Sequence, residues 1–239
     1  MNFLDINVLN EIAEKNHDNY VNADPFPHIV LKGLFNNDDL KECADEFATM
    51  RPRMTAKNAN NTVQKYSFNR VENAYEKFEP KTQKIVDDLN SKEFLQFLEK
   101  LTGIDDLEND PMFEGGGPHE ILTGGFLKMH VDFNLHHFTK QQRKLNLLLY
   151  LNDDWKASWG GELELWDTEF KDMSKSIKPN INTMVIFSTT NNSWHGHPDP
   201  LNCPQGKSRK SLALYYYNPP SDKKIKAHTT IYKKRMFKD

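Results

Sequence analysis

The chain has 239 residues and a formal net charge of -3 at pH 7, and it is long enough to bury a substantial core as a single domain. The weakly acidic balance argues against nucleic acid as a partner, because binding to phosphates requires a basic surface. No apolar run approaches the roughly 20 residues of a membrane span, and the N-terminus lacks a secretory leader, so we expect a soluble, cytoplasmic, intracellular protein without a membrane partner.

Helical patterns dominate the first 110 residues. The first helix is predicted to begin near Ile6 and to end before Pro25, and residues 28–35 are apolar enough for a buried strand. Asn37 is a candidate N-cap for a second helix that buries Cys43. With only one other cysteine far along the chain, neither a disulfide framework nor a thiolate zinc site is indicated.

A further helix is predicted between Ser91, a residue type that caps helix N-termini, and Gly103, which ends helices in the left-handed conformation. Before it, residues 51–70 are polar and basic and follow no clear period. They predict an exposed connection, and the alternative is a mobile loop over the site.

The pattern changes near residue 115 to short aromatic, β-branched or leucine-rich runs separated by turn residues. The candidate strands are residues 126–133, 145–151, 161–166, 183–187 and 211–217. We therefore predict an α+β protein with a mainly β core, either a sandwich or a barrel. A mostly helical support of residues 1–110, a β core of residues 111–220 and a C-terminal tail of residues 221–239 would form one catalytic domain.

His130 and Asp132 end a strand-like segment and are the first candidate site residues. On an extended chain residues i and i+2 face the same side, so both can reach one metal ion. With one remote histidine they would form a facial set that suits iron(II) and leaves three coordination positions open. His136 and His137 follow in a loop, and we interpret them as loop residues that can contact a substrate.

The remote histidine comes from the segment Trp194-His195-Gly196-His197-Pro198. The two histidines have the same parity, so alternation alone does not choose between them. His195 is favoured because it follows the strand at 183–187 and its polar turn directly. His197 is then a residue behind the metal ligands or a substrate contact.

Arg209 opens the last predicted strand, and Ser211 shares its face. A guanidinium inside a barrel requires an anionic partner and matches a carboxylate with two parallel hydrogen bonds, whereas the alternative is a surface arginine paired with an acid. On a facing strand Asn146 and Tyr150 share one side, and the Tyr150 hydroxyl can join the same carboxylate. These four residues are the predicted cofactor-binding set.

Several segments in order resemble the iron(II)- and 2-oxoglutarate-dependent dioxygenases, in the branch similar to the prolyl 4-hydroxylases. They are Gly-Gly-Phe-Leu-Lys-Met-His-Val-Asp-Phe-Asn at 124–134, Leu-Tyr-Leu-Asn-Asp-Asp-Trp at 149–155, Gly-Gly-Glu-Leu-Glu-Leu-Trp at 160–166, His195, and Arg-Lys-Ser-Leu at 209–212. The resemblance covers residues 117–220. One departure is Ile121-Leu122-Thr123, where many prolyl hydroxylases have a tyrosine.

The resemblance implies a double-stranded β-helix, or jelly roll, in which His130, Asp132 and His195 bind Fe(2+). It also implies that 2-oxoglutarate chelates the ion and that its distal carboxylate meets Arg209 and Tyr150, with O2 as co-substrate and ascorbate as reductant. The expected activity is hydroxylation of an unactivated C-H bond, above all in a prolyl residue of a peptide or protein.

Two alternatives remain, a hydroxylase of a small metabolite such as a free amino acid or sugar, and a non-catalytic jelly roll that binds a metal or ligand. A groove lined by Trp155, Trp159 or Trp194 would favour a peptide, and a closed pocket would favour a metabolite. The sequence gives no indication of the oligomeric state.

Overall fold

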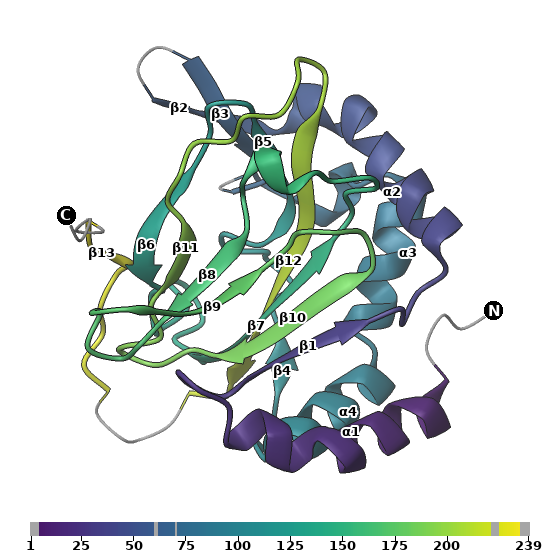
Figure 1. The fold of residues 1–239 in the computed structure, drawn as a ribbon. Coiled ribbons are helices and arrows are strands. Elements are labelled where there is room, and N and C mark those ends of the chain that lie inside the picture. Colours follow the sequence, from purple (N-terminus) through teal and green to yellow (C-terminus); the bar gives the residue numbers. More distant parts are fainter. Residues whose placement is uncertain (1–4, 60–61, 70, 221–224, 235–239) are drawn as a thin grey trace.

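The computed structural model describes residues 5–59, 62–69, 71–220 and 225–234 (Figure 1). Its centre is a pair of antiparallel sheets, an eight-stranded sheet in the order β1-β10-β7-β12-β5-β3-β2, with β4 paired to β12, and a five-stranded sheet in the order β13-β6-β11-β8-β9. The strands of the larger sheet are β1 His28–Lys32, β2 Thr55–Ala59, β3 Thr62–Ser67, β4 Glu108–Asn109, β5 Gly117–Leu122, β7 Gln142–Tyr150, β10 Thr183–Ser188 and β12 Ser208–Asn218. The strands of the smaller sheet are β6 Leu127–Val131, β8 Leu163–Trp166, β9 Met173–Ile177, β11 His195–His197 and β13 Ile231–Tyr232.

All five predicted strands are present, as β6, β7, β8, β10 and β12, with bounds shifted by a few residues. The predicted class, a mainly β core of jelly-roll type with helical support, is confirmed. The sequence missed β5 and β9, whose apolar periods are weak, and the short strands β4 and β11. These strands are recognisable only by their neighbours in the sheets.

Alternation along β7 shows how the larger sheet separates two cores. Leu145, Leu147 and Leu149 pack into the core shared with the helices. Leu148 and Tyr150 pack into a second core with residues of the smaller sheet. The space between the sheets is therefore lined by every second residue of each strand, which is the period that places the candidate site.

Four helices pack on the outer side of the larger sheet, with α1 and α4 together and α2 and α3 together (Figure 1). They are α1 Ile6–Val21, α2 Asn37–Met50, α3 Pro80–Leu89 and α4 Lys92–Thr102; short 3-10 turns occur at η1 Arg51–Arg53, η2 Tyr75–Lys77 and η3 Ala157–Trp159.

Two of the predicted helix ends are correct and one is shifted. Ser91 accepts a hydrogen bond from the Phe94 amide at 3.2 Å, and Gly103 ends α4 with φ of 71°. The cap of α2 is Asn36, whose side chain accepts from the Asp38 amide at 2.7 Å, so the prediction of Asn37 was wrong by one residue. Cys43 is fully buried in α2, as predicted.

Residues 51–70 do not form an exposed connection, which corrects the prediction. After η1 the chain forms the β2–β3 hairpin, which extends the larger sheet beside β5. Residues 60, 61 and 70 lie outside the described part. The polar composition of residues 51–70 did not indicate this hairpin, because a strand at a sheet edge does not need a fully apolar sequence.

Residues 225–234, in the predicted C-terminal tail, extend the smaller sheet by one short strand. β13 pairs with β6, so that Tyr232 lies opposite His130. The Lys233 ammonium lies 4.4 Å from the ring centroid of Trp194. The end of the described chain therefore covers the edge of the smaller sheet beside a candidate metal ligand. Among the helices of the described ranges, none is long and apolar enough to cross a membrane.

Candidate active site

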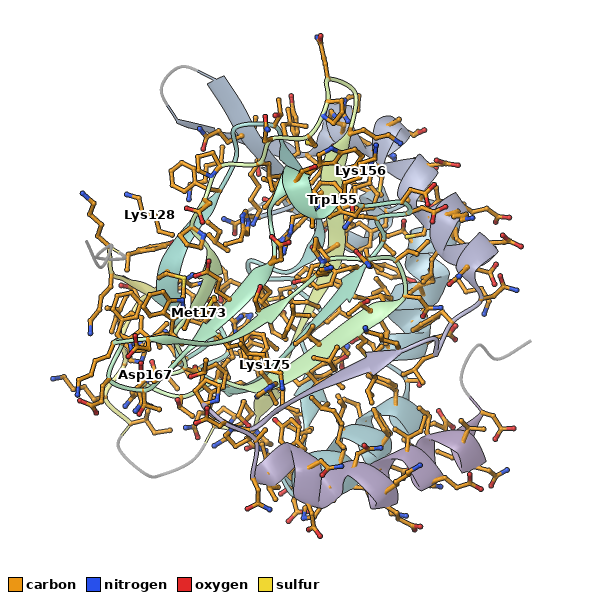
Figure 2. All side chains as sticks on the ribbon, viewed as in Figure 1. Lys128, Trp155, Lys156, Asp167, Met173 and Lys175 are labelled. Carbon is orange, nitrogen blue, oxygen red and sulfur yellow. The ribbon has the colours of Figure 1, made fainter. Side chains whose placement is uncertain are left out.

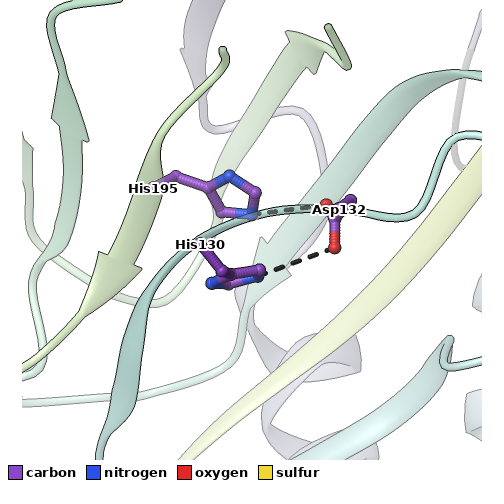
Figure 3. Close-up of side chains that lie close together, drawn as sticks. All are labelled: His130, Asp132 and His195. Atoms are coloured by element: carbon purple, nitrogen blue, oxygen red, sulfur yellow. Dashed lines mark ion pairs between the residues drawn. The ribbon is translucent and has the colours of Figure 1, made fainter. Parts of the chain in front are cut away.

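Three predicted ligands meet between the sheets. His130 on β6 lies directly opposite His195 on β11, and Asp132 follows the end of β6. The Nε2 atoms of His130 and His195 lie 3.6 and 3.4 Å from carboxylate oxygens of Asp132 (Figure 3). One ligand atom of each residue lies within 4.8 Å of the others. Ligands about 2.1 Å from one ion lie about 3 Å apart, so the spacing fits a metal site.

The protonation of both imidazoles also fits a metal. His130 Nδ1 lies 2.8 Å from the Lys128 carbonyl oxygen, and His195 Nδ1 lies 3.0 Å from that of Ser193. A carbonyl only accepts, so each Nδ1 carries the hydrogen and each Nε2 presents its lone pair toward Asp132. Burial, with the neighbouring His130, lowers the pKa of His195 to about 4, so this ring is neutral at pH 7.

Asp132 is held by two side chains of β7. Its Oδ2 atom accepts from Asn146 Nδ2 at 2.7 Å and from Arg143 Nη2 at 3.1 Å. Burial alone would raise the pKa of Asp132, but Arg143 and the two imidazoles outweigh it and hold the pKa well below the usual range. The carboxylate is therefore ionised and fixed, as a ligand for a divalent cation must be.

Sequence reasoning missed Arg143. This side chain is buried, donates to Asn146 Oδ1 through Nε at 2.9 Å, and has its guanidinium carbon 3.4 Å from the Tyr215 ring centroid. Strict alternation puts positions 143 and 146 on opposite faces. A bulge removes this difference, because Leu145 pairs with Tyr216 whereas Arg143 pairs with Tyr217. No signal in the sequence marks the bulge.

Arg209 also lies between the sheets, buried at the start of β12. Its Nε donates to the Gly161 carbonyl at 2.7 Å, and its Nη2 donates to the Tyr150 hydroxyl at 3.1 Å. Within the described part of the chain no acidic side chain pairs with this guanidinium, although three of its five N-H groups remain. An unpaired buried cation beside a tyrosine hydroxyl is suited to a carboxylate ligand.

The predicted cofactor set is divided between two places. Ser211 is buried and pairs with Tyr150, so it lies on the same face as Arg209. Asn146 instead contacts Asp132 and Arg143. The four side chains thus line one space. Asn146 lies beside the candidate metal ligands, whereas Tyr150 and Ser211 lie beside Arg209.

The remaining histidines take different positions. His197 is 3% exposed on the same face of β11 as His195, and neither of its ring nitrogens has a hydrogen-bond partner among the residues that the structure describes. His136 is buried in a separate cluster, with Nε2 3.4 Å from both Asp110 and Glu114. His137 is exposed in the loop.

Of the three tryptophans predicted to line a peptide groove, two remain candidates for that role. Trp155 and Trp159 are partly exposed, form an edge-to-face pair with centroids 5.1 Å apart, and pack against the cluster that contains Ile121. Trp155 is labelled near the top of Figure 2, on the connection that follows β7. Trp194 is buried in a different cluster with Trp166, so it does not line a groove.

Residues 117–217 match the family model of the 2OG-Fe(II) oxygenase superfamily. The chain is 24% identical over 203 residues to the prolyl 3-hydroxylase OGFOD1 of Mus musculus. The aligned region covers 83% of this chain and 34% of that protein. It therefore spans about a third of the length of this relative.

Solved structures share the fold. A prolyl hydroxylase from Trichoplax adhaerens, in complex with a peptide fragment of the oxygen degradation domain of hypoxia inducible factor, is 15% identical with a TM-score of 0.60, over 89% of this chain and 92% of that chain. HygX from Streptomyces hygroscopicus, with nickel, 2-oxoglutarate and hygromycin B bound, is 12% identical with a TM-score of 0.51, over 82% and 84% of the two chains.

Proposed function

We propose that the chain is a 2OG-Fe(II) oxygenase, the superfamily whose model matches residues 117–217, and that it hydroxylates a prolyl residue of a peptide or protein, using iron(II), 2-oxoglutarate and O2. One observation carries the proposal. Two imidazoles with free Nε2 lone pairs and an ionised carboxylate converge in the same inter-sheet space as an arginine that has no acidic partner among the described residues.

The residues divide the work. His130, Asp132 and His195 would hold iron(II) on one face and leave three positions for small molecules. Arg209 and Tyr150 would hold the distal carboxylate of 2-oxoglutarate by charge-assisted hydrogen bonds. When bound, iron(II) supplies the chemistry that couples oxidative decarboxylation of 2-oxoglutarate to C-H hydroxylation. The protein orients these groups, and no acid-base pair of side chains is required.

The prolyl substrate rests on similarity and on the surface beside the site. The relatives with prolyl hydroxylase activity in their names motivate the choice. Trp155 and Trp159 offer partly exposed aromatic surface next to Ile121, which suits a proline ring and its flanking chain. We further propose that the helices and barrel form one catalytic domain, because α1 to α4 share a hydrophobic core with the larger sheet. Ascorbate belongs to the same proposal as the reductant that keeps the iron ferrous.

The first test is anaerobic addition of iron(II) and then 2-oxoglutarate to the protein. We expect a visible charge-transfer band that is lost in Asp132→Ala and retained in His137→Ala, which alters an exposed loop histidine. Addition of O2 with ascorbate should then yield succinate only when both iron and 2-oxoglutarate are present. A protein that shows no band and forms no succinate would contradict the oxygenase assignment.

The second test identifies the substrate. Proline-containing peptides and a panel of free amino acids and sugars are incubated with the loaded enzyme, and products heavier by one oxygen are sought by mass spectrometry. Hydroxyproline in a peptide supports the proposal. Hydroxylation of a free metabolite alone would refute the peptide substrate and leave the oxygenase assignment intact.

A further inference from the structure

A second cationic side chain faces the pocket of Arg209. Arg209 on β12 pairs with Ile121 on β5, and Ile121 pairs with Lys65 on β3. Residues directly opposite one another on neighbouring strands face the same side of a sheet. Lys65 therefore faces the space between the sheets, two strands away from Arg209. Ile121, which lies between them, offers no hydrogen-bonding group.

Lys65 has no hydrogen bond or ion pair with any residue in the described ranges, although its side chain is half-buried. Burial, together with the charges of Lys57 and Arg209, lowers the pKa of its ammonium to about 8. The acid that acts on it, Asp132, is already paired with Arg143. A cation in such surroundings is costly unless a ligand supplies the anion.

His197 approaches the same place from the smaller sheet. Its ring is 3% exposed, and both nitrogens are buried without a hydrogen-bond partner in the described part of the chain. His197 lies on the same face of β11 as His195, so it faces the space between the sheets in which Arg209 lies and toward which Lys65 points. Buried polar atoms are almost always hydrogen-bonded in folded proteins, and an orphaned imidazole that faces a site indicates a missing ligand.

We propose that Lys65 and His197 complete, with Arg209, a pocket for the distal carboxylate of the dicarboxylic co-substrate. This inference rests on the proposed function. Donors from β3, β11 and β12 then surround one carboxylate, and the two sheets are linked through it. The arrangement selects a 2-oxo acid with a second carboxylate over one that ends in a methyl group.

The test measures binding rather than turnover. The manganese(II)-loaded protein is titrated with 2-oxoglutarate, and separately with 2-oxopentanoate, which replaces the distal carboxylate by a methyl group, in a calorimeter. We expect Lys65→Met and His197→Leu each to weaken 2-oxoglutarate binding by about tenfold or more, the loss expected for one charge-assisted or buried hydrogen bond. Binding of 2-oxopentanoate should be unchanged in both variants.

The controls separate a contact from a general loss of charge or fold. Lys32→Met removes an exposed lysine on β1, at the other end of the larger sheet, and it should bind 2-oxoglutarate like the wild type. Lys65→Arg and His197→Asn, which keep a donor, should retain most of the affinity. Manganese affinity and melting temperature report whether each variant is folded and loaded.

The outcomes are distinct. Wild-type affinity for 2-oxoglutarate in Lys65→Met and His197→Leu, or an equal loss for 2-oxopentanoate, would overturn this inference alone. A wild-type protein that binds metal but not 2-oxoglutarate would overturn the proposed function and this inference together.

Discussion

Replacing Arg143 by methionine tests whether the Asp132 carboxylate, a candidate metal ligand, depends on a buried cation. In the metal-free protein the substitution leaves Asp132 with one strong donor, Asn146 at 2.7 Å, in place of two. Breaking a buried ion pair from one side costs about 3–5 kcal/mol, because the remaining charge keeps its desolvation penalty. Asp132 is slightly exposed, so we expect a loss near the lower limit, about 3 kcal/mol.

The pH dependence identifies the cause of this loss. The folded-state pKa of Asp132 lies well below its ordinary value, so its contribution to stability is present above the unfolded pKa of about 4 and is lost as pH falls through the folded pKa. Without Arg143 the pKa rises. The stability difference between wild type and Arg143→Met should therefore be largest near pH 7 and should shrink below about pH 4.

The assay is urea unfolding of the metal-free proteins between pH 3 and pH 8, repeated with manganese(II). A bound divalent cation neutralises Asp132, so the metal should restore most of the stability that the variant loses. Arg53→Met is the matched control, because Arg53 pairs with Glu79 at the surface, where such pairs contribute about 1 kcal/mol or less. A pH-independent loss, or a loss no larger than that of the control, would refute the electrostatic role of Arg143.

Three further predictions concern the pocket. Gly161→Ala should destabilise the protein by about 1–3 kcal/mol and weaken 2-oxoglutarate binding in calorimetry. A Cβ atom there would lie 2.5 Å from a leucine methyl and 3.0 Å from the Arg209 side chain, whereas Gly124→Ala, also at positive φ but in open space, should leave binding unchanged. Lys65→Met should melt at a higher temperature than the wild type at pH 7. In the wild type, the lowered folded-state pKa of Lys65 destabilises the folded protein fully below about pH 8 and no longer above about pH 10.5, the pKa in the unfolded chain. The higher melting temperature of the variant should therefore decline across this range. Trp159→Ala should raise KM for a peptide substrate without changing the dissociation constant of 2-oxoglutarate; an unchanged KM would exclude this side chain from the peptide site.

The convergence of His130, Asp132 and His195 was predictable because the relevant physics is local. Alternation on one strand places His130 and Asp132 on one side, and the predicted strand on which they lie is β6. The choice of His195 over His197 depended on the length of the turn before it. The structure pairs His195 directly with His130, whereas His197 pairs with Leu127, so only His195 lies opposite the first candidate ligand.

The residues that the sequence did not reveal depend on distant neighbours. Arg143 reaches Asp132 only through a bulge, and the signal for a bulge is the mismatch in register with β12, which one strand alone does not carry. Lys65 reaches the pocket only because the β2–β3 hairpin extends the larger sheet next to β5. A polar segment without period gave no reason to place a strand there.

Two buried arginines between the same sheets show how structural and ligand-binding charges can be distinguished. Arg143 has its acid within the protein, at 3.1 Å, and aromatic rings of Phe133 and Tyr215 against its faces, so its charge is balanced before any ligand arrives. Among the described residues, Arg209 donates only to a carbonyl and a hydroxyl, and neutral acceptors do not balance a charge. The uncompensated charge of Arg209 beside Tyr150 therefore opposes folding and favours the binding of an anion. A carboxylate ligand should stabilise the protein by more than a neutral ligand that makes the same hydrogen bonds.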